Sequence, residues 1–311
     1  MKEKYHESIK SIPELANILE KCPSFNFANN VQELFNLACG TPENNFFEVT
    51  YDLPEKGAFT EVTVARVRNG IAVNYTEAYM RRRDPDCLVV GDDGPTDKKT
   101  YKERFGKDFS ELRNETFDWL ANQELALFAF KTGADEFEED ALAVVPLNAA
   151  FFALGLALLQ GITPVSELTD NFSPRTVFYV APPFRHTHLN GKQVVVHNRL
   201  SSQYEIFSYN LYPGPSAKKG VYGVLINQGE NEGWVVPHCS AVEVVTPYDN
   251  IVTFMHEGAS GGGKSEMLEQ PHRMSDGRMK VGQNTQTGEK LYIEIPRTCE
   301  LHPVCDDMAL C

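Results

Sequence analysis

The sequence is short of positive charge. It contains 29 Lys and Arg residues against 43 Asp and Glu residues, which gives a formal net charge of -14 at pH 7. Binding to the nucleic-acid backbone requires a basic face that displaces counterions, so this composition argues against a nucleic-acid partner. An acidic protein that binds nucleotide anions must concentrate its basic residues locally, and two clusters do so, Arg81–Arg83 and Lys218–Lys219.

The sequence also lacks the marks of an exported protein. The first residues, Met-Lys-Glu-Lys-Tyr-His-Glu, are charged and contain no apolar core of a signal peptide. The cysteines are odd in number and scattered, which indicates free thiols in a reducing compartment rather than a disulfide framework. They are Cys22, Cys39, Cys87, Cys239, Cys299, Cys305 and Cys311. Both features predict a cytoplasmic protein.

No uninterrupted apolar run is long enough for a membrane span. The uncharged stretch 141–162 contains Pro146 and Asn148. We expect Asn148 to cap a buried helix, Ala149–Gln160, that Gly161 ends, and such a helix is too short to cross a bilayer.

The chain has the length and apolar content of two domains or one large one, with 311 residues of which 42% are hydrophobic. Its pattern alternates helical and β-rich segments, which predicts an α/β fold. Residues 1–39 are expected to be helical, with a second amphipathic helix at Val31–Cys39. Residues 46–51, 59–67, 71–75, 176–180, 193–197 and 291–295 are expected to be strands, residues 109–130 to be helix then strand, and residues 205–245 to be β-rich with a turn at 227–229.

His186 and His188 are one residue apart in a segment expected to be extended. They could share a metal ion on one side of such a segment, but no third ligand is near in sequence. A pair of surface histidines is the preferred interpretation.

A glycine-rich segment carries the clearest chemical signal. It fits the phosphate-loop pattern G-x-x-x-x-G-K-[ST], with a β-prone run before it (Ile251–Met255) and a helix-capable segment after it (Glu266–Gln270). Backbone N–H groups of such a loop can surround phosphate oxygens. Lys264 would reach the β- and γ-phosphates of a nucleotide, and Ser265 would hold Mg²⁺. The expected nucleotide-binding residues are Gly258, Ala259, Ser260, Gly261, Gly262, Gly263, Lys264 and Ser265.

Three separated motifs together resemble one family, the ATP-dependent phosphoenolpyruvate carboxykinases. They are Lys218-Lys219-Gly220, then His238-Cys239-Ser240-Ala241, then the glycine-rich segment. In the family these pieces read Lys-Lys-Gly, His-Cys-Ser-Ala and Gly-x-Ser-Gly-x-Gly-Lys-Thr, in the same order, and the interval from Lys219 to His238 is also that of the family.

The resemblance implies a site with two metal ions. Lys219, in its neutral form, and His238 would be ligands of Mn²⁺, and Arg82, Lys219 and Lys264 would act in catalysis. The family's Asp-Asp pair would correspond to Asp306, near the nucleotide's Mg²⁺, and Asp307, the third Mn²⁺ ligand. Because this pair follows the loop at a longer interval than in the family, Asp276 remains an alternative ligand.

The substrate end resembles the family less closely. The stretch Arg82 to Asp93 corresponds to an arginine loop that would place Arg82 on a substrate carboxylate, but the glycine, serine and lysines of that loop are absent. An arginine loop exposed to solvent is the alternative. Tyr212 would correspond to a tyrosine that faces the substrate.

The resemblance therefore implies a phosphoenolpyruvate-carboxykinase-like α/β fold. Residues 1–205 would form a substrate-side α/β domain, and residues 206–311 the start of a mixed-sheet nucleotide-binding domain. The expected activity uses ATP or GTP with Mg²⁺ and Mn²⁺ to convert a small carboxylate, oxaloacetate, to phosphoenolpyruvate, with no nucleic-acid or membrane partner. The alternatives are a kinase on the same nucleotide core, as in HPr kinase/phosphorylase relatives, or a nucleotide-binding module without catalysis.

The motifs near the end of the sequence lead to two further expectations. A phosphate loop usually precedes most of its nucleotide domain, so we expect this chain to be the N-terminal part of a longer protein. Cys299, His302, Cys305 and Cys311 lack the usual spacing of zinc ligands, and the cysteines are interpreted as free thiols. Neither the acceptor of the phosphoryl group nor the oligomeric state follows from the sequence.

Overall fold

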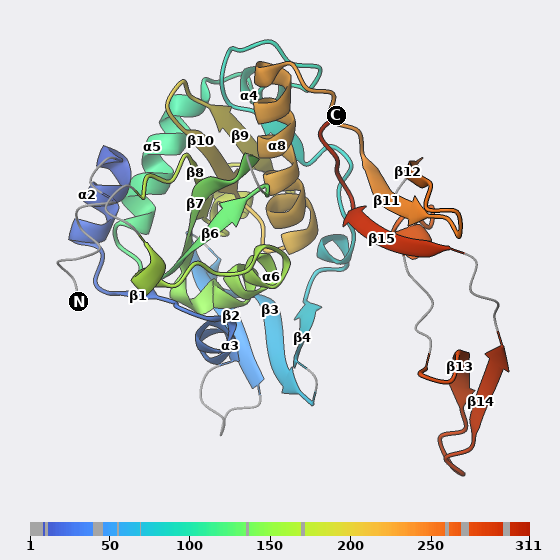
Figure 1. Ribbon diagram of the computed structural model, residues 1–311. Helices are drawn as coiled ribbons and strands as arrows, with labels where there is room; N and C mark the ends of the chain where they lie inside the picture. Colours follow the sequence, from blue (N-terminus) through green and yellow to red (C-terminus); the bar gives the residue numbers. More distant parts are fainter. Residues whose placement is uncertain are drawn as a thin grey trace. The chain divides into compact units, whose positions relative to one another are not determined.

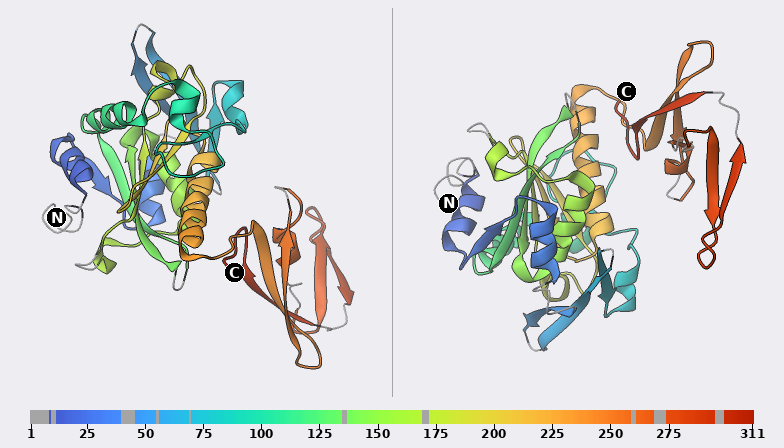
Figure 2. Two further views of the ribbon diagram at one scale, coloured as in Figure 1. Left: turned by 90° about the horizontal axis from the view of Figure 1, so that it is seen from above. Right: turned by 60° about the horizontal axis from the view of Figure 1, so that its bottom comes forward.

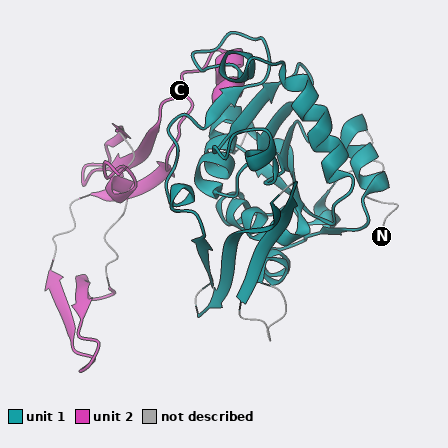
Figure 3. Cartoon of the chain, turned by 180° about the vertical axis from the view of Figure 1, so that it is seen from behind, with its two compact units in different colours: residues 1–225 teal, residues 226–311 magenta. Residues whose placement is uncertain are grey.

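The structure is a computed structural model (Figure 1). It describes residues 9, 12–39, 46–54, 56–68, 70–134, 137–168, 172–258, 261–268, 274–294 and 299–311. The chain divides into two compact units, residues 1–225 and residues 226–311 (Figure 3). This division falls later than residue 205, where the sequence led us to expect it.

The first unit is built on a mixed seven-stranded sheet. The pairs β6–β7 and β9–β10 are antiparallel, and the other neighbouring pairs are parallel. The strands, in spatial order, are β1 (Phe25–Phe27), β6 (Leu125–Thr132), β7 (Glu139–Pro146), β8 (Thr176–Val180), β10 (Tyr204–Ser208), β9 (Val195–Arg199) and β5 (Leu88–Val90).

Helices cover both faces of this sheet (Figure 2). On one face lie α2 (Pro13–Lys21) and α5 (Phe109–Leu120), and on the other lie α3 (Val31–Cys39), α6 (Ala150–Gln160) and α8 (Lys219–Glu232). Two short helices, α4 (Tyr101–Phe105) and α7 (Phe184–Thr187), lie in the connections. The arrangement confirms the α/β fold class.

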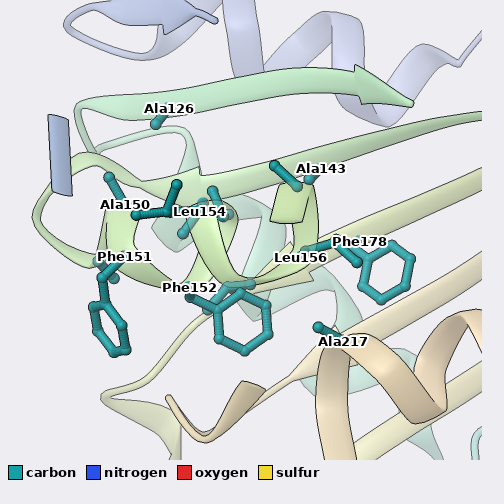
Figure 4. Close-up of a cluster of buried hydrophobic side chains, with 14 of the residues drawn as sticks. Ala126, Ala143, Ala150, Phe151, Phe152, Leu154, Leu156, Phe178 and Ala217 are labelled. Carbon is teal, nitrogen blue, oxygen red and sulfur yellow. The ribbon is translucent and has the colours of Figure 1, made fainter. Parts of the chain in front are cut away.

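The central strands are apolar on both sides because each side is covered by helices. In β6, Leu125 and Leu127 belong to the core against α2 and α5, whereas Phe128 and Phe130 belong to the core against α6. All four side chains are fully buried. Figure 4 shows the second of these cores, where Phe178 of β8 lies with the apolar residues of α6.

The predicted core helix forms, but its first turn differs from the expectation. The helix α6 ends at Gly161, whose φ of 77° suits a residue without a side chain. Asn148 does not cap it. A short 3₁₀ turn, Leu147–Ala149, comes first, and the Asn148 amide instead donates to the carbonyl of Thr50 at 2.9 Å. Among the described residues, no helix is long and apolar enough to cross a membrane.

The N-terminal region is less helical than expected. The expected helix is interrupted by β1, which pairs with β6 at the edge of the sheet. The next three strands form as predicted, and they pair in a separate antiparallel sheet: β2 (Phe46–Leu53), β3 (Gly57–Val67) and β4 (Gly70–Tyr75).

The largest error of the sequence-based prediction concerns α8, which lies within the stretch expected to be β-rich. Glycines and β-branched residues lower helix propensity, and the predicted turn at 227–229 is helical instead. The glycines allow close packing onto the sheet. A Cβ atom on Gly220 would lie 2.6 Å from the Phe178 ring, and one on Gly223 would lie 2.5 Å from the His197 ring. Tertiary packing therefore overrides local preference here.

The first prediction tests this close packing. Gly223→Ala is expected to destabilise the protein by about 1–3 kcal/mol because the new methyl group overlaps the buried His197 ring. The measurement is chemical denaturation of the full chain. Gly155→Ala in α6 is the matched control, since its nearest neighbour, Pro213 Cβ, is 3.4 Å away and alanine favours the helix. Equal destabilisation by both variants would contradict this account of α8.

A buried ionic network joins α7 to the small antiparallel sheet of the first unit. Arg185 is 1% exposed, its Nε lies 3.4 Å from a carboxylate oxygen of the fully buried Glu61, and its Nη2 donates to Glu77. The Tyr51 hydroxyl also donates to Glu61. Burial raises the pKa of Glu61, whereas the charge of Arg185 opposes that rise. The network is held together by a charge pair removed from water.

The second prediction removes the cation from this network. Arg185→Met is expected to cost about 3–5 kcal/mol because Glu61 keeps a buried charge without its partner. Without Arg185, the pKa of Glu61 in the folded protein rises further above its unfolded value. Protonation then favours folding at low pH, and this contribution is lost as pH rises. Denaturation at pH 5 and pH 8 should therefore show the larger loss at pH 8, and a pH-independent loss would contradict the prediction.

The second unit contains two small antiparallel sheets. One has the order β12 (Ile251–Glu257), β11 (Cys239–Val245) and β15 (Glu300–Cys305), and the other is a hairpin of β13 (Arg278–Gln283) and β14 (Lys290–Glu294). The predicted strands before the glycine-rich loop and near residues 291–295 are confirmed.

Candidate nucleotide and metal site

The three-stranded sheet brings three distant parts of the sequence to one edge. Both β12 and β15 are antiparallel to β11, with Cys239 opposite Glu257 and Ala241 opposite Cys305. The ends of β12 and β15 therefore lie where β11 begins. The glycine-rich loop follows β12, the acidic pair follows β15, and His238 directly precedes β11.

The glycine-rich loop folds back on itself. The Lys264 ammonium donates a hydrogen bond to the carbonyl of Gly258 at 3.0 Å, and this lysine is only 9% exposed. Gly261 and Gly263 have φ values of 80° and 84°, which other residues adopt at a cost. Ala259 and Ser260 lie outside the described residues. The two ends of the loop are thus connected through the side chain expected to reach the phosphates.

Ser240 of β11 forms a hydrogen bond to the glycine-rich loop. Its fully buried hydroxyl donates to the carbonyl of Lys264 at 2.7 Å. The sequence contained this residue within the motif His-Cys-Ser-Ala but gave no role for it. A small hydroxyl residue two positions after the histidine is the signal that could have indicated the contact.

The segment after the loop is a short 3₁₀ turn, Ser265–Leu268, anchored by the buried Leu268. The expected helix Glu266–Gln270 is described only as far as Leu268. Within that part the structure shows no α-helical turn that could add a helix dipole to the loop.

The acidic pair contacts the loop and the histidine. The Ser265 hydroxyl donates to Asp306 at 2.8 Å, and His238 Nε2 lies 2.8 Å from Asp307 Oδ1. Asp307 has a φ of 96°, a strained value for a residue with a side chain. The alternative ligand, Asp276, instead holds Arg278 of the hairpin at 2.8 Å. The geometry joins each predicted aspartate to the residue with which it was expected to act.

The donors of this edge fit the expected metal ions in chemistry. Carboxylate oxygens suit Mn²⁺, imidazole is a ligand of several divalent transition metals, and a hydroxyl beside a carboxylate suits Mg²⁺ with its water shell. In the described part of the chain, no three His, Cys, Asp or Glu side chains converge closely enough to hold a metal ion. His238 and Asp307 are two of the three expected Mn²⁺ ligands. The third, Lys219, belongs to the first unit, where its ammonium lies 4.2 Å from the centre of the Tyr222 ring.

The expected substrate residues also belong to the first unit. Arg82 is exposed, and its carbonyl accepts a hydrogen bond from Gln193 at 2.7 Å. Tyr212 contacts the ring of Tyr75 edge to face at 5.9 Å, and Arg81 donates to the Tyr75 carbonyl. Tyr75 therefore links the segment of Tyr212 to the neighbour of Arg82, although no contact joins the two predicted side chains among the described interactions.

The two neighbouring histidines make separate contacts. They lie at α7 rather than on an extended segment. His186 contacts the ring of Phe59 at 4.5 Å, and His188 pairs with Glu115 at 2.8 Å. Burial lowers the pKa of His186 to about 4.

The chain is thus an α/β protein. Its first unit has three layers, and its small second unit has antiparallel sheets and carries the glycine-rich loop. The chain belongs to the family described as Domain of unknown function (DUF4914), which matches residues 12–311. No curated protein matches it.

The third prediction concerns the anchor of the loop. Ser240→Ala removes the hydrogen bond to the Lys264 carbonyl and should cost about 1 kcal/mol in stability. It should also speed amide hydrogen exchange over residues 261–268. Ser208→Ala, which removes a buried hydroxyl from the first unit, is the control. If amide hydrogen exchange over residues 261–268 is unchanged in Ser240→Ala, the hydrogen bond from Ser240 does not hold the loop in place.

Proposed function

We propose that the protein performs nucleotide- and divalent-metal-dependent phosphoryl transfer of the phosphoenolpyruvate-carboxykinase type, on the corresponding fold. The observation that carries the proposal is the convergence of Lys264, Ser265, His238, Asp306 and Asp307 at one edge of the second unit's sheet. The resemblance supplied these residues from three separate segments, and the antiparallel topology supplies a physical reason for them to meet.

The residues of this edge have separate roles in the proposal. Lys264 would release the Gly258 carbonyl and bind the β- and γ-phosphates, where its charge stabilises the transferred group. Ser265 and Asp306 would hold Mg²⁺ and its water shell, and His238 and Asp307 would hold Mn²⁺; Lys219, the third ligand that the resemblance implies, belongs to the first unit. The metal ions, when bound, would supply neutralisation of negative charge on the phosphates and on an enolate.

Arg82 and Tyr212 would bind the small carboxylate, oxaloacetate, whose decarboxylation with a nucleoside triphosphate gives phosphoenolpyruvate, CO₂ and the diphosphate. A guanidinium group pairs well with a carboxylate through two parallel hydrogen bonds. The solvent exposure of Arg82 leaves it accessible to a ligand. A cytoplasmic location, with reduced thiols, is part of the same proposal.

A kinase acting on another acceptor is the second candidate. The departure of the stretch Arg82 to Asp93 from the carboxykinase pattern favours it, because the nucleotide edge resembles the family more closely than the substrate residues do. The two candidates share the nucleotide and metal residues and differ in the acceptor.

The fourth prediction tests the shared part. Calorimetric titration of ATP and of GTP, with Mg²⁺ and Mn²⁺, should show binding to the full chain. Lys264→Ala should weaken nucleotide binding by roughly tenfold or more, since it removes charge-assisted hydrogen bonds to phosphate. His238→Ala should remove the contribution of Mn²⁺ and retain binding with Mg²⁺ alone. Lys280→Ala, on the exposed hairpin, is the matched control and should bind normally.

The outcomes separate the candidates. Nucleotide and Mn²⁺ binding that depends on Lys264 and His238, followed by turnover of oxaloacetate, would support the carboxykinase hypothesis. If the nucleotide binds in the same way and is hydrolysed, or its phosphoryl group is transferred to another acceptor, while oxaloacetate does not react, the kinase is favoured. Binding without turnover would identify a nucleotide-binding module, and equal binding by Lys264→Ala and the unaltered chain would refute the site.

A further inference from the structure

Sulfur atoms gather on one face of the second unit's sheet, around the small residue Ala241. Cys305 of β15 and Met255 of β12 both stand opposite Ala241, and Cys239 precedes Ala241 by two positions, so all face the same side. Cys311 completes the group, with its sulfur 3.6 Å from the Met255 sulfur. We refer to Cys239, Met255, Cys305 and Cys311 as the sulfur cluster.

The three thiols of the sulfur cluster differ in exposure. Cys239 is fully buried, Cys305 is partly buried and Cys311 is exposed. Cys239 and Cys305 are diagonal neighbours on one face of the paired strands β11 and β15, and Cys311 contacts Met255 on the same face. An oxidant in solution would therefore reach the Cys311 thiol first. Cys239 and Cys305 are placed to form a disulfide with each other.

The sulfur cluster is covalently next to the nucleotide edge. Cys239 lies between His238 and Ser240, and Cys305 directly precedes Asp306. Movement of either cysteine must therefore move a side chain that contacts the loop or the acidic pair.

We propose that Cys239 and Cys305 form a reversible disulfide that regulates this edge, and that Cys311 is where a hydroperoxide oxidant reacts. The effect on nucleotide binding rests on the proposed function, whereas disulfide formation does not. The Cys311 sulfur attacks a peroxide oxygen, the O–O bond breaks, and an alcohol or water leaves with the thiol proton, giving a sulfenic acid.

Two exchange steps complete the reaction. The Cys305 sulfur attacks the Cys311 sulfenic acid, an S–S bond replaces the S–O bond, and water leaves. The Cys239 sulfur then attacks Cys305 and releases Cys311 as a thiol. In total, two thiols give up two electrons and two hydrogens, and the hydroperoxide is reduced to an alcohol, or to water, plus one water.

The disulfide would strain the sheet at the site. Diagonal neighbours on antiparallel strands are typically about 7–8 Å apart, whereas a disulfide usually joins Cα atoms about 5.5–6 Å apart. Closing this gap would shift β15 along β11 and displace Asp306 and Asp307 from Ser265 and His238. Strained disulfides are also more easily reduced, which suits a reversible change.

The fifth prediction maps the bond. The full chain is treated with hydrogen peroxide, its remaining thiols are blocked, and its peptides are analysed by mass spectrometry without reduction. A Cys239–Cys305 disulfide is expected. Cys305→Ser should abolish it, and Cys311→Ser should slow its formation by roughly tenfold because the exposed thiol reacts fastest. Cys299→Ser, which changes another exposed cysteine of the same unit, should leave it unaltered.

Two further readouts test the regulatory effect. Oxidation should change amide hydrogen exchange at residues 238–240 and 305–307, and it should weaken nucleotide binding by roughly tenfold or more, with recovery after dithiothreitol. These changes should be absent in Cys305→Ser, and Cys239→Ala provides a second test should that variant fold poorly.

Absence of the Cys239–Cys305 disulfide, or a bond formed mainly through Cys299, would overturn the proposal. A disulfide that leaves both hydrogen exchange and nucleotide affinity unchanged would overturn the regulatory part. If the reduced chain binds no nucleotide, the proposed function fails, and the peptide map and the hydrogen exchange still decide whether the disulfide forms and alters this edge.

Discussion

Antiparallel pairing of β11 with two strands from opposite sides is the constraint on which the second unit depends. Hydrogen bonds in an antiparallel ladder fix direction as well as register. Because β12 and β15 both run against β11, a loop that follows one and an acidic pair that follows the other must meet beside His238. The contacts of Ser265 and His238 with the aspartates are consequences of this topology.

The first unit depends on a different constraint, the burial of both faces of its sheet. Apolar residues must alternate between two helical layers, and a helix over the central strands must approach them closely. The glycines of α8 meet this second requirement at a cost in helix propensity. Arg185 and Glu61 are one buried charge pair in this unit, tolerated because the charges compensate one another.

Much of the fold could be predicted where pattern and propensity agree. The strand Thr176–Val180 and the helix Val31–Cys39 form with the predicted bounds. The prediction failed at α8, where close packing against Phe178 and His197 outweighs local preference. It also failed at β1, a short edge strand formed only because β6 is available to pair with it. Local pattern carries no information about such partners. For the candidate site, spacing identified the loop, whereas the acidic pair came only from the resemblance.

The long interval between loop and acidic pair shows why spacing alone was a weak guide. The intervening chain includes the hairpin of β13 and β14, which pair with each other. Loop-closure entropy grows only slowly with loop length, so an insertion that forms its own hydrogen bonds costs little. The position of Asp306 and Asp307 is fixed by the pairing of β15 with β11 rather than by their distance in sequence from Lys264. A group of side chains brought together by strand pairing can therefore tolerate a long intervening segment, and register, more than sequence interval, is the property to compare with the carboxykinases that the sequence resembles.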